Sequence, residues 1–377
     1  MTTSFISNQT TNLLFGAIDL SKRHWVCCFR NAAGLRREFT VPAYDLAALK
    51  AKIDEAADKL GANTQGAKIL HEAGRDGFAV HRALTALGYD SIVADPGSFE
   101  QPKRGGRRRK TDRIDTRAMA DKVYLEYIGE KPFKRVRIIS AEDEDLRHLR
   151  RERERLVRQR TAVLNELGSL FAVHGLSLSG AALRKAADKL DSLRNAIGEP
   201  LRSHLKNRIS RAFERLELID GQVVAVEAER DAALENAEIA RAAAEAALLS
   251  QVKGVGTQTA FLLSVELFWR DFDRSKQVGA ATGLVGTPFD TGGRQREQGI
   301  EKAGNRRVRT SLVQLAWRWL RWQKESHLTK WYERKWGGGS KRQRRIGIVA
   351  LARRLAIALW RLAKFGQVPA GAVMKTK

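Results

Sequence analysis

The chain has 377 residues, which is enough for two or three domains of about 150 residues each and excludes a mini-protein with too little core to fold alone. It carries 68 Lys and Arg against 43 Asp and Glu, a formal net charge of +25, which must be tolerated as self-repulsion or matched by a polyanion, with nucleic acid as the first candidate. Its only cysteines, Cys27 and Cys28, are adjacent and exclude a disulfide framework, and no stretch of about 18 apolar residues could span a membrane. The N-terminus has no basic segment followed by a long apolar one, so we expect a cytoplasmic protein.

The N-terminal third predicts a mixed sheet with helices packed on it. Three consecutive strands are expected in LLFGAIDLS, which starts at Leu13, in HWVCCFRN and in REFTVP. Apolar residues at helical spacing follow from Leu46 to Leu60, and then a strand (AKILHEAG), a helix from Phe78 to Leu87 and a strand (SIVADP) alternate. Three strands followed by alternating helix and strand are typical of an α/β or α+β domain.

The rest of the chain is predicted to be mostly helical. The segment from Pro102 to Lys110 has no apolar residue and is expected to be a loop, with a helix starting near Thr111. Between about Ala141 and Leu249 the composition predicts long helices, paired as a coiled-coil-like arm. The C-terminal part is expected to be a compact helical domain with a basic surface, because residues 294–364 hold 20 Lys and Arg against 4 Asp and Glu. We therefore expect three domains, at residues 1–135, 136–250 and 251–377.

Four carboxylates are the candidates for chemistry in the first third of the chain. Asp19 and Glu72 each end a predicted buried strand, while Asp112 and Asp115 are spaced i, i+3 at a helix start and so share one helical face. Such a set could bind one or two Mg²⁺ ions, which prefer oxygen ligands and can assist phosphodiester displacement. Taken singly, each residue is more simply explained as a helix cap, an ion-pair partner or a surface charge. The eight Lys and Arg at positions 103–117 favour the metal site, because they would draw a phosphate backbone toward it.

Two segments of the C-terminal third are candidates for nucleic-acid chemistry. The turn VKGVGTQTA, which contains Lys253, resembles a helix-hairpin-helix turn that binds phosphate, although a tight turn between helices explains its glycines equally well. Further on, Thr291 lies between Asp290 and two glycines in an arginine-rich run, where an exposed hydroxyl could attack a phosphodiester. A turn or helix cap made by Thr291 is the simpler interpretation. In the following Trp and Arg stripe we expect Trp319 to pack in the core. The basic residues expected to contact nucleic acid are Lys103, Arg104, Arg107, Arg108, Arg109, Lys110, Lys253, Arg294, Arg296, Arg306, Arg307 and Arg309.

The order of these motifs resembles that of a known family. Asp19 in GAIDLSKRHW, Glu72 in ILHEAG and the segment KTDRIDTRAMA, followed by VKGVGTQTA and GIEKAGNRRVRTSLVQLAWRWL, are similar to the DEDD transposases of the bacterial insertion sequence 110 family, most of all its 1111 subgroup. The resemblance covers almost the whole chain. It implies a RuvC-like, ribonuclease-H-type α/β N-terminal domain in which Asp19, Glu72, Asp112 and Asp115 bind Mg²⁺. It also implies a long helical coiled-coil linker and a mostly α C-terminal transposase domain with a hydroxyl nucleophile.

The same resemblance implies a mechanism and partners. In such enzymes the hydroxyl attacks DNA and forms a covalent phosphoester, a structured RNA encoded by the element guides the choice of sites, and dimers assemble into tetramers. A bacterial cytoplasmic protein, associated with the nucleoid when active, is implied as well. The family usually has Ser where this sequence has Thr291, whose β-methyl group restricts χ1 and crowds an in-line attack.

Three functions follow from these features. The first is an RNA-guided, Mg²⁺-dependent DNA transposase or recombinase with Thr291 as the attacking group. The second is a resolvase-like metal-dependent nuclease in which water attacks and Thr291 is dispensable. The third is a non-enzymatic nucleic-acid-binding protein whose carboxylates are structural. We favour the first.

Overall fold

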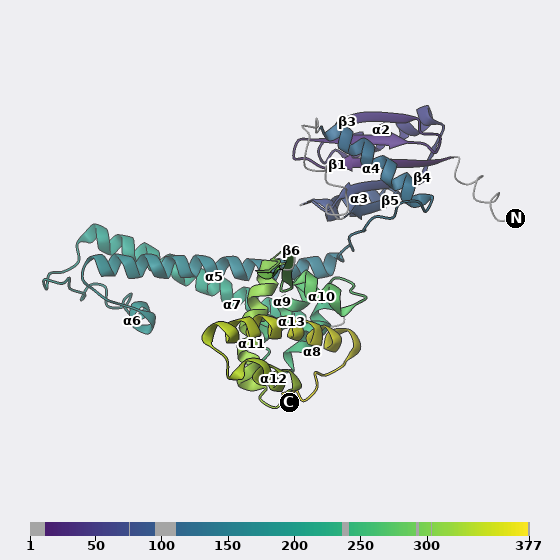
Figure 1. Cartoon of the computed structure of the whole chain (residues 1–377). Helices are drawn as coiled ribbons and strands as arrows, with labels where there is room; N and C mark the ends of the chain where they lie inside the picture. Colours follow the sequence, from purple (N-terminus) through teal and green to yellow (C-terminus); the bar gives the residue numbers. More distant parts are fainter. Residues whose placement is uncertain are drawn as a thin grey trace. The chain divides into compact units, whose positions relative to one another are not determined.

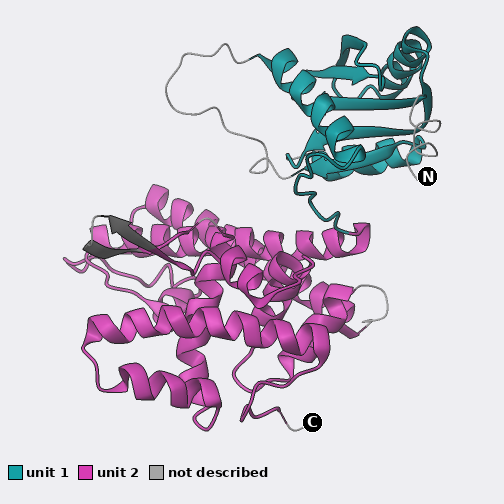
Figure 2. Ribbon diagram, turned by 45° about the vertical axis from the view of Figure 1, so that its right-hand side comes forward, with its two compact units in different colours: residues 1–139 teal, residues 140–377 magenta. Residues whose placement is uncertain are grey.

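The computed structural model describes residues 12–74, 76–94, 111–235, 241–291, 294–302 and 304–375, and the side chains of 288–298 lie outside the description. The chain folds into two compact units, Met1–Ile139 and Ser140–Lys377, which are drawn in different colours in Figure 2. Each unit contains its own buried clusters and is considered by itself. The division into three domains at residues 135 and 250 stays a prediction.

The first unit is built on a five-stranded mixed sheet (Figure 1). Its strands are β1 (Leu13–Asp19), β2 (His24–Arg30), β3 (Arg36–Pro42), β4 (Asn63–Glu72) and β5 (Asp90–Ala94), in the order β3-β2-β1-β4-β5. The first three strands are antiparallel neighbours, whereas β4 pairs with β1 and with β5 in parallel. The predicted three-strand meander, the two later strands and the mixed sheet are therefore confirmed.

Helices cover both faces of this sheet. On one face, α2 (Leu46–Leu60) and α3 (Gly77–Ala86) pack against a cluster that includes Leu14 and Ile18. On the other face, α4 (Asp112–Tyr127) packs against a cluster that includes Phe15 and Ala17, because successive side chains of a strand point to opposite faces.

The two adjacent thiols show the same alternation in β2. Cys27 belongs to the cluster under α2 and α3, whereas Cys28 belongs to the cluster under α4. Both cysteines are free and fully buried, so the prediction that they do not form a disulfide is confirmed.

The second unit begins with two long helices. α5 (Ala141–Val173) and α7 (Ser203–Glu235) each have 33 residues and lie side by side (Figure 1). Phe171 near the end of α5 packs with Ile209 near the start of α7, and Leu156 packs with Val223, so the two helices run antiparallel. The short helix α6 (Gly180–Lys185) lies in the connection between them. The predicted long paired helices are present, and coiled-coil geometry stays a prediction.

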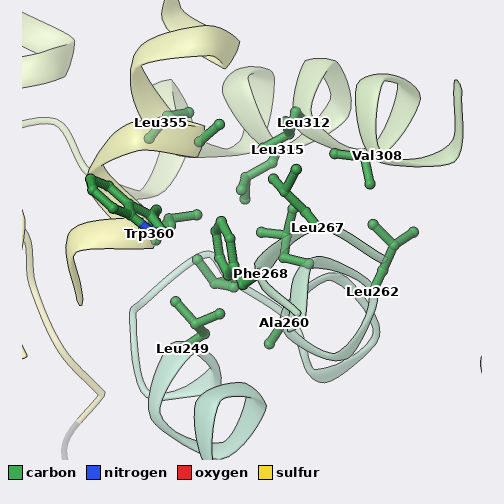
Figure 3. Packing of buried hydrophobic residues seen from close by; sticks show 14 of the residues in the cluster. Leu249, Ala260, Leu262, Leu267, Phe268, Val308, Leu312, Leu315, Leu355 and Trp360 are labelled. Atoms are coloured by element: carbon green, nitrogen blue, oxygen red, sulfur yellow. The ribbon is translucent and has the colours of Figure 1, made fainter. Parts of the chain in front are cut away.

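The remainder of the second unit is a helical bundle with one hairpin. Its buried cluster joins residues far apart in sequence, such as Leu249, Phe268, Leu312 and Leu355 (Figure 3). Trp319 is fully buried and donates a hydrogen bond from Nε1 to Ser326 at 2.8 Å, which confirms its expected packing role. The elements are α8 (Arg241–Ser250), α9 (Thr257–Leu263), the π-helical turn η2 (Ser264–Phe268), α10 (Ser275–Ala281), β6 (Gly286–Thr291), β7 (Arg294–Ile300), α11 (Arg306–Trp322), α12 (His327–Tyr332), the π-helical turn η3 (Glu333–Gly337) and α13 (Lys341–Phe365). None of the helices within the described ranges has the length and apolar character that a membrane crossing needs.

Candidate functional site

Two of the four candidate carboxylates end neighbouring parallel strands of the sheet. β1 and β4 pair in parallel with Ile18 opposite His71, and the next residues, Asp19 and Glu72, are the last of their strands. Ala17 and Leu70 face α4, so strand alternation places Asp19 and Glu72 on the α4 face as well. Asp19 is half-buried and Glu72 is exposed.

The other two candidates lie in the first turn of α4. Thr111 caps this helix, and its side chain accepts a hydrogen bond from the Ile114 amide, so Asp112 is not the cap. The buried stripe of α4 contains Thr116, Met119, Ala120 and Val123. Asp112 and Asp115 stand four residues before Thr116 and Met119 and therefore continue that stripe by one turn toward the helix start. Asp112 is exposed and Asp115 is half-buried.

Ion pairs to the sheet fix the direction of α4. Asp121 accepts hydrogen bonds from Arg30 at 2.6 Å and from Arg36, and Arg30 lies opposite Phe15 at the beginning of β1. One turn earlier, Arg117 pairs with Glu38.

The pair of Arg117 and Glu38 lies farther toward the C-terminal end of β1 than the pair of Arg30 and Asp121. Glu38 is opposite Cys28, which is opposite Ala17 in the middle of β1. Following α4 backward to its start therefore leads along β1 toward Asp19. The start of α4 lies over the end of the sheet at which β1 and β4 terminate.

The pair of Arg117 with Glu38 also sets the charge of that carboxyl group. The hydrogen bond and charge of Arg117 hold the pKa of Glu38 below its usual range, although partial burial opposes the shift. Glu38 is therefore a carboxylate that is paired with the guanidinium group of Arg117. It is not one of the four candidate metal ligands.

Carboxylate oxygens suit a hard divalent cation, so the donor chemistry of the four residues fits Mg²⁺. Asp19, Glu72, Asp112 and Asp115 share one face and one end of the sheet. Among the residues that the structure describes, however, no three His, Cys, Asp or Glu side chains lie close enough together to hold a metal ion. The backbone thus brings the four positions to one region without closing their side chains into a ligand set. The basic residues from Lys103 to Lys110 lie outside the described part of the chain.

Thr291 lies at the end of a β-hairpin. It is the last residue of β6 and pairs with Arg294, the first residue of β7. The side chains of Thr291, Arg294 and Arg296 are outside the description, so their predicted roles stay predictions. The sequence predicts a turn or a helix cap at Thr291, whereas the structure has two paired strands.

The base of this hairpin is anchored by close backbone contacts. A Cβ atom on Gly304 would lie 2.3 Å from the Ala281 carbonyl oxygen and 2.4 Å from the Gly283 nitrogen. Arg309 donates hydrogen bonds to the carbonyl oxygens of Lys302, at 3.1 Å, and Gly304. Residues 281–283 are therefore held tightly against Lys302 and Gly304 on the other side of the hairpin.

Three predicted nucleic-acid contacts begin α11, and they differ in their surroundings. Arg306 is exposed. Arg307 pairs with Glu154 of α5 at 2.5 Å, and Arg309 binds the loop carbonyls. Arg307 and Arg309 thus have intramolecular partners, and contact with nucleic acid stays a prediction for all three.

A buried carboxylate near this helix start was not anticipated from the sequence. Glu266 in η2 is 5% exposed, accepts a hydrogen bond from Arg151 at 3.0 Å and also binds Asn305. Burial raises its pKa, but the hydrogen bond from Arg151 and the charges of Arg147 and Arg307 lower it further, so the net direction is downward. An Asn immediately before a helix is a capping signal, which could have identified Asn305 but not its partner.

The glycine turn around Lys253 has an architectural role. Gly254 has a φ of +88°, and a Cβ atom at this position would lie 3.1 Å from the Trp322 side chain. Buried Gln323 donates to the Lys253 carbonyl oxygen at 2.7 Å and so fixes the turn. Lys253 itself is exposed, and its ammonium group lies 5.9 Å from the Trp322 ring centroid.

Two protein-family models match the chain. Residues 17–174, which contain all four candidate carboxylates, match a DEDD-type IS110 model described as a transposase. Residues 246–332, which contain Thr291, match a model described as the transposase IS116/IS110/IS902 family.

Proteins with similar sequences have related names. The chain is 37% identical over 376 residues to y4rJ of Sinorhizobium fredii (strain NBRC 101917 / NGR234), whose name assigns it to the transposases, and the match covers 96% of this chain and 95% of that protein. It is 28% identical over 239 residues to the transposase for insertion sequence element IS1111A of Coxiella burnetii, covering 62% of this chain and 60% of that protein. It is also 28% identical over 225 residues to the transposase for insertion sequence element IS1328 of Yersinia enterocolitica, covering 58% and 63%.

Proposed function

Because the chain belongs to the IS116/IS110/IS902 family of transposases, we propose that it cuts and joins DNA strands as an RNA-guided transposase or recombinase of an insertion sequence. The observation that carries the proposal is the common position of Asp19, Glu72 and the start of α4 at one edge and on one face of the sheet. Rigid carboxylates at the ends of buried strands suit a reaction that needs fixed charge beside a phosphodiester. A RuvC-like, ribonuclease-H-type domain is part of the same proposal.

We assign Asp19, Glu72, Asp112 and Asp115 as the residues that would hold Mg²⁺. Bound there, the ion would stabilise negative charge that develops as a phosphodiester is displaced. The strands hold Asp19 and Glu72, while the ion pairs of Arg117 and Asp121 hold the helix that carries the other two. Closure of the four side chains around the ion is part of this proposal.

The group we assign as nucleophile is the hydroxyl of Thr291. Its oxygen forms a bond to phosphorus as the bond from phosphorus to one deoxyribose oxygen breaks. The Thr291 hydroxyl loses its proton, and the released deoxyribose oxygen gains one, so the step needs no oxidant or reductant. Attack by a second DNA strand end on the resulting phosphoester reverses the process and frees Thr291.

Family membership alone supports the other parts of the proposal. They are a guide RNA encoded by the element, a homodimer or homotetramer, and a place in the bacterial cytoplasm near the nucleoid. The word "insertion sequence" in the names of two relatives supports an element end and a target site as the DNA partners.

The test uses the full chain with element-end DNA, the element's RNA and MgCl₂, and detects a protein–DNA adduct on a denaturing gel. We expect Asp19→Asn and Asp115→Asn to abolish the adduct. Asp54→Asn, the same change at an exposed position of α2, should retain it. An adduct of undiminished yield in the Asp19 variant would overturn the metal assignment.

The replacement of the family's usual Ser by Thr291 favours a second candidate, a resolvase-like nuclease in which water attacks. Thr291→Ala separates the two functions, since the transposase would lose its adduct while the nuclease would cleave DNA as before. Thr291→Ser should retain the adduct if the hydroxyl attacks. DNA that is bound but never cut or joined at any Mg²⁺ concentration would leave only a binding protein.

A further inference from the structure

The first two turns of α13 form an exposed basic surface. Lys341, Arg342, Arg344 and Arg345 are all exposed, within five consecutive residues that contain no acidic group. Three of these cations line a hollow in the surface together with Ile346 and Val349. We call the residues Lys341, Arg342, Arg345, Ile346 and Val349 the α13 basic patch.

Within the described ranges the cations of this patch have no ion-pair partner, whereas several arginines of the second unit do. Arg153 pairs with Glu227 at 2.5 Å, and Arg307 pairs with Glu154. By contrast, no ion pair joins Lys341, Arg342 or Arg345 to any residue in the described ranges. Three neighbouring side chains with uncompensated positive charge attract a polyanion whose negative charges are spread over a similar distance.

Their position also opposes the electrostatics of the helix. The start of a helix carries partial positive charge, so a cation in the first turn is unfavourable where an acidic residue would stabilise the helix. α5 shows the favourable arrangement, with Glu142, Asp143 and Glu144 in its first turn. α13 has 25 residues and no acid in its first turn, and its start depends on Ser340 and Gln343, which form a capping box. The basic residues therefore lower the stability of the helix that they begin.

The backbone of the patch is held by contacts with Trp336 and Tyr332. A Cβ atom on Gly347 would lie 2.7 Å from the Trp336 ring, so the helix backbone rests directly on this side chain. The Tyr332 hydroxyl donates a hydrogen bond to the Arg344 carbonyl oxygen at 3.3 Å. Ile346 is 54% exposed, so an apolar side chain remains in the middle of the charged surface.

We propose that the α13 basic patch binds the sugar-phosphate backbone of double-stranded DNA. From Lys341 to Val349 the helix rises about 12 Å, a length over which one strand of a duplex presents roughly three to four phosphates. The three cations pair with phosphates, and Ile346 contacts a deoxyribose between them. The proposal rests on the proposed function only in taking DNA as the partner. It requires neither the metal site nor the Thr291 step.

The experiment measures binding of the full chain to a 30-base-pair duplex of arbitrary sequence, with no Mg²⁺, at several salt concentrations. Log Kobs falls as log salt rises. The variant Lys341→Gln/Arg342→Gln/Arg345→Gln should reduce the steepness of this fall by about 2 to 3, at about 0.9 for each lost phosphate contact. Two duplexes of unrelated sequence should lose affinity equally, because backbone contacts carry no sequence information.

The matched control removes the same number of charges elsewhere. Lys50, Lys52 and Lys59 are exposed on α2 and paired with Asp54 or Glu55, so changing all three to Gln should leave most of the slope intact. The charge-conserving variant Lys341→Arg/Arg342→Lys/Arg345→Lys should bind as the parent does. Because Gln is a good helix former and three unfavourable charges are gone, the melting temperature of the patch variant should not fall.

Equal losses in the patch variant and the α2 control would overturn the proposal in favour of an effect of net charge alone. A patch variant that binds duplex DNA normally but loses affinity for a structured RNA of similar length would assign the surface to RNA instead. The binding assay contains no Mg²⁺ and the metal assignment is tested by the adduct, so a failure of the metal assignment and a failure of the patch give different results.

Discussion

The side-chain amide of Asn305 donates a hydrogen bond to Glu266 at 3.0 Å, while its carbonyl oxygen accepts one from the Arg307 amide at 2.9 Å. One side chain thus caps α11 and joins it to the buried turn η2. Arg151 of α5 completes the arrangement from the other side of Glu266. The helix that follows the Thr291 hairpin is therefore positioned by two other elements, η2 and α5.

Asn305→Asp should destabilise the second unit by about 1–3 kcal/mol. Asp caps a helix as well as Asn does, so the loss reports the contact with Glu266, where two carboxylates would now meet. Denaturant unfolding of the full chain measures it. The double variant Asn305→Asp/Glu266→Gln exchanges the donor and acceptor and should recover part of the loss. A double variant no more stable than Asn305→Asp would contradict this account.

Asp121→Asn should destabilise the first unit by about 2 kcal/mol, because it leaves Arg30 without its counterion. The Arg30 side chain is only 10% exposed, and its guanidinium also lies 4.2 Å from the Tyr124 ring centroid. Asp54→Asn makes the same chemical change in an exposed pair with Lys50 and should cost less than about 0.5 kcal/mol. Equal costs in the two variants, measured by chemical denaturation, would show that the α4 pair adds nothing beyond a surface contact.

The stability of the first unit should depend on pH through His71. Burial lowers the pKa of this fully buried histidine from 6.5 to about 4, with a hydrogen bond to the Glu72 carbonyl opposing the shift. Above pH 6.5 the ring is neutral in both folded and unfolded chains. Between 6.5 and 4 only the unfolded chain takes up a proton, so the free energy of unfolding falls as the pH falls, by about 3 kcal/mol in all.

Two measurements check this pH dependence. His71→Gln should make the free energy of unfolding less sensitive to pH between 4 and 6.5, because one difference in proton uptake is removed. In NMR spectra of the folded protein, the His71 ring should stay neutral until the pH approaches 4. A midpoint near 6.5 in the folded protein would contradict the prediction.

Gly304→Ala should destabilise the base of the hairpin by about 2–4 kcal/mol, because the new methyl group meets backbone atoms that can move only if the loops separate. Gly168 in the interior of α5 offers a control of opposite sign. Its Cβ position is open, so Gly168→Ala should stabilise the protein by about 0.5–1 kcal/mol. Thermal unfolding of both variants tests the pair, and a neutral Gly304→Ala would show that the contact is loose.

The elements of the first unit could be predicted because their signals are local. The continuous apolar run from Leu14 to Ile18 and the spacing over Leu46 to Leu60 depend only on neighbouring residues, and the expected start near Thr111 is confirmed by its capping hydrogen bond. The carboxylates at 19 and 72 could be placed at strand ends in the same way. Their common face, and the run of α4 toward them, depend on pairing between distant segments and could not be read from the sequence.

The C-terminal site shows where local patterns stop being informative. Arg307 looked like one cation among several beside Thr291, yet its partner, Glu154, lies 153 residues earlier in the chain. Glu266 and Asn305 are 39 residues apart, and neither is distinctive alone. Contacts of this kind depend on how the helices pack, which periodicity does not specify.

Cys27 and Cys28 are neighbours in sequence but report on opposite layers of the first unit. Burial raises the pKa of both thiols, that of Cys28 to about 11, so neither is reactive while the layers stay closed. A thiol reagent would modify Cys28 only when α4 lifts from the sheet, and Cys27 only when α2 and α3 separate from it. The rate of labelling at Cys28 would therefore measure how often the helix that bears Asp112 and Asp115 separates from the sheet. The measurement needs no introduced cysteine.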